Sequence, residues 1–146
     1  MMSIAVVSRN SGNISGRYKK YFGDSVSLSQ TARKGLKPAA VFDFISLSKL
    51  PNISIEHLLN KTIKTFNSYK TNETLLDATT SEKLLKLFAL YDKGLLVFGS
   101  AAEFNAWLGE IATGLGGQVP ETLLDTITGI TLVTEELTRI EYGDLA

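Results

Sequence analysis

From residue 24 onward, apolar residues recur at intervals of three and four, and no segment there alternates convincingly with a period of two. Such intervals place apolar side chains along one face of a helix. The pattern therefore predicts an all-α fold of about eight short helices. Residues 1–23 mix short apolar patches with Ser, Asn and Gly and keep neither period. We expect residues 1–23 to be a mobile N-terminal segment, with a short strand at residues 4–7 as its one regular element.

Two capping boxes predict helix starts in the second half of the chain. They are residues 79–82 (TTSE) and residues 100–103 (SAAE), in which a hydroxyl and a carboxylate each bond a free backbone amide. The helix after the second box carries Phe104, Trp107, Leu108 and Ile111 at helical spacing. This spacing favours one inward face, so we expect these four side chains to be core residues and not contacts with a partner.

Charge divides the chain into two halves of opposite sign. Residues 1–78 carry eleven basic and five acidic side chains, a net charge of +6, whereas residues 79–146 carry four basic and ten acidic ones, a net charge of −6. This asymmetry indicates a half that faces nucleic acid, joined to a half that avoids it or meets a basic protein. Alternatively, the two halves neutralise each other across an internal interface. We divide the chain into residues 1–23, a helix-turn-helix-like DNA-binding or dimerisation domain at 24–78, and a second domain at 79–146.

Composition argues against an enzyme, a metal protein or a membrane protein. The chain has no Cys and one His, and its longest apolar run has five residues, so we expect no thiol chemistry, metal site, cofactor or membrane span. His57 is better explained as a surface or half-buried side chain than as a general base. Gly114, Gly116 and Gly117 follow no strand and are better explained as a turn than as a phosphate loop. We expect a soluble cytoplasmic protein without catalytic residues.

Residues 53–70 fit a helix-turn-helix: a short helix, a polar turn at residues 60–62 and a second helix whose outward side chains could enter a major groove. Hydroxyls and an amide can read base edges, while lysines neutralise phosphates. The alternative is a plain packing unit of two amphipathic helices. The predicted DNA-binding residues are Lys61, Lys64, Thr65, Asn67, Ser68, Tyr69 and Lys70.

Four sequence blocks between residues 81 and 146 resemble the toxin-binding domain of the Xre/MbcA/ParS-type antitoxins. The blocks are SEKLLKLFALYDKGLLVFG, AAEFNAWL, LGGQVPETLLDT and RIEYGDLA. Residues 33–70 resemble, more weakly, the Xre-type helix-turn-helix that precedes this domain in the family. There GLKPAAVFDF matches the helix before the reading pair, and KTIKTFNSYK stands where the family usually has a segment richer in Arg.

The resemblance implies a RES-domain toxin as the partner, an enzyme that destroys cellular NAD and that the antitoxin silences by covering its active-site entrance. A pocket for an anionic dinucleotide should be basic, so the acidic C-terminal end would complement it. The alternative for this end is a frayed helix terminus closed by Gly143. Arg139 either bridges to the toxin or pairs with Glu135. The predicted toxin-binding residues are Arg139, Glu141, Tyr142, Gly143, Asp144, Leu145 and Ala146.

These observations together predict the antitoxin of a type II toxin-antitoxin module. It would be non-enzymatic, would block a RES-type toxin, and would repress its own operon by binding operator DNA as a homodimer within a larger toxin-antitoxin complex. The alternative is a helix-turn-helix transcription regulator whose acidic domain serves only dimerisation or another protein partner.

Overall fold

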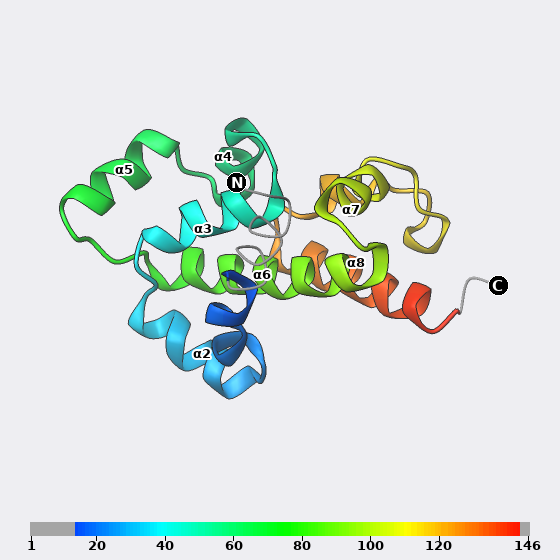
Figure 1. The fold of residues 1–146 in the computed structure, drawn as a ribbon, viewed down its shortest axis with the longest axis horizontal. Helices are drawn as coiled ribbons and strands as arrows, with labels where there is room; N and C mark the ends of the chain where they lie inside the picture. Colours follow the sequence, from blue (N-terminus) through cyan, green and yellow to red (C-terminus); the bar gives the residue numbers. More distant parts are fainter. Residues whose placement is uncertain (1–13, 144–146) are drawn as a thin grey trace, which may run out of the picture.

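The structure, a computed structural model, describes residues 14–143, and helices dominate this range (Figure 1). The prediction of an all-α fold is confirmed. Residues 14–22 form a first helical segment. It is followed by α2 (Ser25–Lys34), α3 (Ala39–Ser48), α4 (Asn52–Leu59), α5 (Ile63–Thr71), α6 (Ala78–Phe98), α7 (Ala101–Leu108), the 3-10 turns η1 (Thr113–Leu115) and η2 (Pro120–Leu123), and α8 (Ile127–Glu141). Within residues 14–143 no helix has the length and apolar character that a bilayer span requires.

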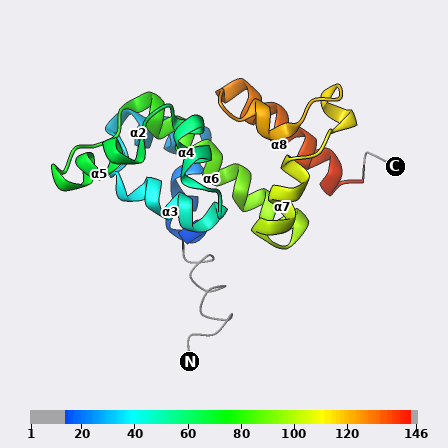
Figure 2. The same cartoon turned by 90° about the horizontal axis from the view of Figure 1, so that it is seen from above.

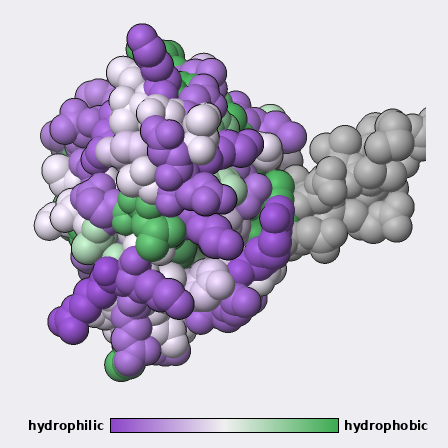
Figure 3. Space-filling model, turned by 90° about the vertical axis from the view of Figure 1, so that its left-hand side faces the viewer, coloured by the Kyte–Doolittle hydropathy of each residue, from purple (hydrophilic) through white to green (hydrophobic). Residues whose placement is uncertain are grey.

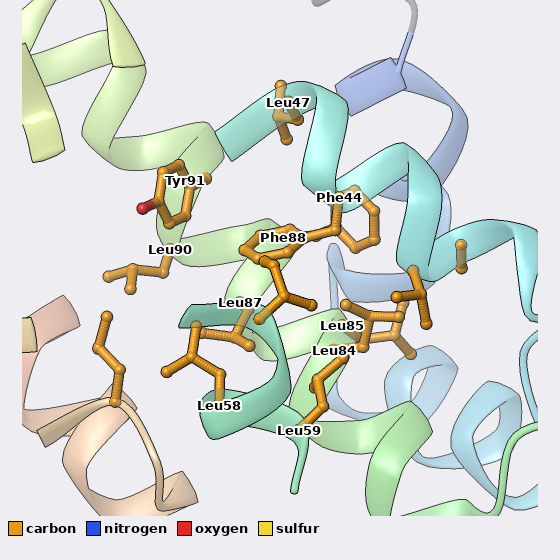
Figure 4. Packing of buried hydrophobic residues seen from close by; sticks show 14 of the residues in the cluster. Phe44, Leu47, Leu58, Leu59, Leu84, Leu85, Leu87, Phe88, Leu90 and Tyr91 are labelled. Carbon is orange, nitrogen blue, oxygen red and sulfur yellow. The ribbon is translucent and has the colours of Figure 1, made fainter. Parts of the chain in front are cut away.

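Helix α6 is the central element of the fold. Helices α2 to α5 gather around its N-terminal end, whereas α7 and α8 gather around its C-terminal end (Figures 1 and 2). Helices α2, α3, α4, α7 and α8 all pack against α6. Its buried face belongs to one hydrophobic cluster that extends through both groups of helices (Figure 4). The fully buried side chains of this face are Leu84, Leu85, Leu87, Phe88, Leu90 and Tyr91.

The helical segment at residues 14–22 corrects the prediction of a mobile N-terminal segment. The ring of Tyr18 stacks on that of Phe88 in α6, with ring centroids 4.1 Å apart. Ile14, one turn earlier, is also buried in the core cluster. Aromatic stacking and apolar burial therefore order this segment. Residues 1–13, with the strand expected there, lie outside the described residues.

The first capping box, residues 79–82, predicted the start of its helix two residues too late. Helix α6 begins at Ala78, and Asp77 is its N-cap, whose carboxylate accepts a hydrogen bond from the Thr80 amide at 3.4 Å. The hydroxyl of Ser81, inside the expected box, is buried and accepts a hydrogen bond from the Leu36 amide at 2.9 Å. A carboxylate at residue 77 caps the helix, and the hydroxyls that follow serve other contacts.

The second capping box is confirmed at the start of α7. The Ser100 hydroxyl accepts a hydrogen bond from the Glu103 amide at 3.2 Å. Phe104 and Leu108 are buried as predicted and Trp107 is partly buried against the cluster. Ile111 is exposed, so its assignment to the core was wrong: α7 ends at Leu108, before the helical spacing reaches Ile111.

Candidate functional site

The end of α8 holds four of the seven residues predicted to bind a toxin. Arg139 and Glu141 lie in its last turn, and Tyr142 and Gly143 follow it directly. Gly143 takes the left-handed conformation (φ 75°) that glycine adopts readily at a helix end. Asp144, Leu145 and Ala146 lie outside the described residues.

An ion pair joins the end of α8 to α6. The Lys93 Nζ lies 3.0 Å from the Glu141 Oε1, and both side chains are partly shielded from solvent. Sequence reasoning assigned Glu141 to the toxin surface and did not single out Lys93. The pair fixes where the chain leaves α8, because α6 is the most deeply buried helix of the core.

A second, buried ion pair lies one turn earlier. Glu136 is 1% exposed, and its Oε1 accepts hydrogen bonds from the Arg139 Nε at 2.8 Å and lies 2.7 Å from another guanidinium nitrogen. One alternative predicted from the sequence was that Arg139 pairs with Glu135. Arg139 does pair within the chain, but its partner is Glu136. Glu135 is exposed. The sequence did contain a signal for the burial of Glu136. This residue lies three positions after Val133 and next to Leu137, and therefore on the same apolar stripe of the helix.

Gly114 closes this buried pair from the side of η1. A methyl group at residue 114 would overlap the Glu136 carboxylate, so a larger residue there would require this side chain to move. The turn assigned to the glycine-rich stretch is confirmed: residue 114 lies in η1, and both Gly116 and Gly117 have positive φ values. Gly114 thus lets the loop approach α8 closely.

Large apolar side chains are exposed at the α6–α8 end of the molecule. Tyr142 is 75% exposed, Leu96 of α6 is 74% exposed, and Ile111, between α7 and η1, is 72% exposed. Exposed apolar and aromatic side chains of this size commonly anchor protein interfaces. The most exposed apolar side chains of the acidic half are therefore of the kind that contacts another protein rather than a small molecule.

The predicted reading helix, α5, forms where the sequence placed it and is capped at its start twice. The Thr62 hydroxyl accepts a hydrogen bond from the Thr65 amide at 3.2 Å, and the Glu56 carboxylate of α4 accepts one from the Ile63 amide at 2.7 Å. Phe66 is fully buried and anchors the helix to the core. The two helices and the turn between them thus form a fixed unit.

The seven predicted DNA-binding residues divide into two groups. Lys64, Asn67, Ser68 and Lys70 are exposed, whereas Lys61, Thr65 and Tyr69 are half-buried. Helix α5 lies at one end of the molecule (Figure 1), and the face seen from that end is largely hydrophilic (Figure 3). The exposed group is the part that another molecule could reach.

Lys61 serves an internal contact. Its ammonium donates hydrogen bonds to the Thr80 hydroxyl at 3.0 Å and to the Asp77 carboxylate at 3.3 Å. Hydrogen bonds from the Thr80 hydroxyl and amide, together with Lys61, hold the pKa of Asp77 below its ordinary value, so the cap of α6 stays ionised. Lys61 therefore ties the turn between α4 and α5 to the start of α6.

One cleft is lined in part by His57, the one histidine of the sequence. It has a volume of about 620 Å³ and lies between α4, α6, α7 and η2, with the exposed His57 at its edge. Glu56, beside it, caps α5, and the Tyr91 hydroxyl donates to the Asn105 Oδ1 at 2.6 Å. Burial raises the pKa of Tyr91, so this hydroxyl stays neutral. Within residues 14–143 no group of three or more His, Asp or Glu side chains could hold a metal ion.

Comparison with known families places the second half of the chain. Residues 93–143 match the family model of the antitoxin Xre/MbcA/ParS C-terminal toxin-binding domain. The resemblance predicted for residues 81–146 is confirmed over this range, and it supports an antitoxin role. The match begins at Lys93 and ends at Gly143, so it contains both ion pairs described above. No curated protein matches the chain.

We predict that Glu136→Ala lowers the free energy of unfolding by about 1–3 kcal/mol, because it leaves the Arg139 guanidinium without its buried partner. Urea unfolding at neutral pH measures the change. The matched control is Glu135→Ala, which removes an exposed carboxylate from the adjacent position and should change the free energy by less than about 0.5 kcal/mol. Equal losses for both variants would show that the buried pair contributes nothing special.

Proposed function

We propose that this protein is the antitoxin of a type II toxin-antitoxin module and acts by binding, without catalysis of its own. The family match of residues 93–143 carries the proposal, because that domain is a toxin-binding domain. The partner is a toxin, and we assign it to the RES type, whose members degrade NAD. The proposed toxin-binding domain spans residues 79–146, of which α6, α7 and α8 form the scaffold.

The C-terminal end is the proposed contact with the toxin's active-site entrance. Lys93 and Arg139 engage Glu141 and Glu136 within the chain, so they position the end of α8. Tyr142 is the exposed aromatic side chain beyond that point, and Asp144 adds a further negative charge. A basic nucleotide pocket would attract this charge, and a flat ring is a common interface anchor.

The first half, residues 24–78, is the proposed DNA-binding and dimerisation domain. Its support is the capped helix α5 with Lys64, Asn67, Ser68 and Lys70 exposed, and a net charge of +2 over residues 24–78, from seven basic and five acidic side chains. An antitoxin that binds its operator as a dimer would place two such helices in successive major grooves. Operator binding would then let the protein repress its own operon.

Removing residues 142–146 should abolish protection against the co-expressed toxin while the fold is retained. The truncation spares Glu141 and hence the ion pair with Lys93, so any loss reports on contact and not on stability. Growth of cells that express toxin and antitoxin measures protection, and thermal unfolding of the purified chain checks the fold. A matched control, Val26→Ala, removes an exposed apolar side chain from α2 and should protect fully.

Continued growth with the truncated chain would contradict the proposed contact. If the truncated chain also still co-purified with the toxin, the tail would be dispensable for binding. If the cells grew although the full chain did not associate with the toxin, the alternative would be favoured. That alternative is a transcription regulator whose acidic half serves another partner.

Replacing Lys64, Asn67 and Lys70 together with Ala should weaken operator binding and reduce the preference for operator over random duplex DNA. Two of the three changes remove a phosphate contact, so the slope of log K against log salt should fall by about 2. Gel-shift titrations at several salt concentrations measure both quantities. Lys19→Ala with Lys86→Ala is the control, because it removes two positive charges outside α5. Unchanged preference and slope would remove α5 from the DNA surface.

A further inference from the structure

A basic cleft lies apart from α5, on the other side of α3. It has a volume of about 590 Å³ and is formed by the helical segment 14–22, the C-terminal end of α2 with the loop after it, and the N-terminal end of α3. Sequence reasoning did not anticipate this cleft, because one of its walls belongs to the segment expected to be mobile. Four of the side chains that line it are basic: Arg17, Lys20, Lys34 and Lys37.

The positive charge of the cleft is largely uncompensated. Asp43 is its one acidic lining residue, and this carboxylate already accepts a hydrogen bond from the Tyr18 hydroxyl at 2.5 Å and lies 3.6 Å from the Arg17 guanidinium. Within residues 14–143 no acidic side chain forms an ion pair with Lys20, Lys34 or Lys37. Three exposed ammonium groups from three different parts of the chain therefore surround one opening.

The backbone adds to this positive potential. Helix α3 begins at Ala39, and its first turn contains no acidic residue. Its N-cap, Pro38, makes no side-chain cap, although the amides of Ala40 and Val41 donate to the carbonyls of Lys37 and Pro38. Ala39 and Ala40 both line the cleft. The positive end of the helix dipole therefore faces the same opening as the lysines, which favours an anion there.

The cleft adjoins the proposed reading helix through α3. The Lys70 ammonium of α5 lies over the Phe42 ring of α3, 5.2 Å from its centroid, whereas Ala39 and Asp43 of the same helix line the cleft. Phe42 is therefore next to cleft residues along one helix. Helix α3 therefore contacts both basic features.

We propose that this cleft binds the phosphate backbone of duplex DNA and supplies the contacts that α5 alone lacks. The proposal rests on DNA binding by the first half of the chain. Exposed lysines on separate elements suit a nucleic-acid backbone with regularly spaced negative charges. Each side chain can adjust to a neighbouring phosphate without fixed geometry. Such contacts position the protein on the duplex and carry no sequence preference.

The test compares two triple variants that remove the same charge. The cleft variant combines Lys20→Ala, Lys34→Ala and Lys37→Ala and removes three positive charges from the cleft. The control variant combines Lys19→Ala, Arg33→Ala and Lys86→Ala. Lys19 and Arg33 adjoin Lys20 and Lys34 in the sequence but do not line the cleft. Binding to operator and to a random duplex is measured by fluorescence anisotropy at several salt concentrations. All six side chains are partly or fully exposed, so both variants should fold, and thermal unfolding checks this.

We expect the cleft variant to lower the salt slope by about 2 to 3 on both duplexes and the control to lower it by less than 1. Replacing the same three lysines with Arg should preserve binding. Equal slopes for the cleft and control variants would overturn the proposal. Unchanged DNA binding with weakened co-purification of the toxin would also overturn it and assign the cleft to protein.

The α5 variant, in which Lys64, Asn67 and Lys70 are replaced with Ala, distinguishes failure of the cleft proposal from failure of the proposed DNA binding by α5. Loss of operator preference on changing α5, with an unchanged slope on changing the cleft, would leave the proposed function standing and remove the cleft from it. The converse result, a lower slope from the cleft and no effect of α5, would retain the cleft and reject the reading helix. A full chain with no affinity for either duplex would contradict both.

Discussion

The apolar face of α6 is the constraint on which the rest of the structure depends. One 21-residue helix supplies core side chains to the helices around its N-terminal end and to those around its C-terminal end. Neither group has a separate core, so we expect them to fold as one cooperative unit. The charge division between residues 1–78 and 79–146 therefore falls across a shared core, and α2 to α5 are held at the opposite end of α6 from α7 (Figure 2).

The same constraint explains how the C-terminal end is positioned. Lys93 lies on α6 and pairs with Glu141, while Arg139 and Glu136 pair within α8 against the loop at Gly114. Glu136 and Glu141 are thus paired within the chain, and we propose that the acidic residue beyond them, Asp144, meets the partner. Only the Glu136 carboxylate is buried, so loss of its partner would be the costlier change, whereas the more exposed pair of Lys93 and Glu141 contributes little stability.

The sequence predicted the helical class, the turn at residues 60–62, the cap at Ser100 and the family resemblance of residues 81–146, which the family model matches at 93–143, because each depends on local spacing or on a short pattern. It failed where order comes from distant residues. The segment at 14–22 folds because Tyr18 stacks on Phe88 and the Ser15 hydroxyl donates to the Asp92 carboxylate at 2.5 Å, partners about seventy residues away. The basic cleft was missed for the same reason, since that segment forms one of its walls.

The central claim is that the C-terminal end of the chain is what meets the toxin. Hydrogen–deuterium exchange of the full chain, alone and bound to its toxin, tests this most directly. The account predicts that the toxin slows amide exchange at residues 139–146 and leaves α5 unchanged. Protection confined to α5 or to the segment 14–22, with residues 139–146 exchanging as in the free chain, would contradict it.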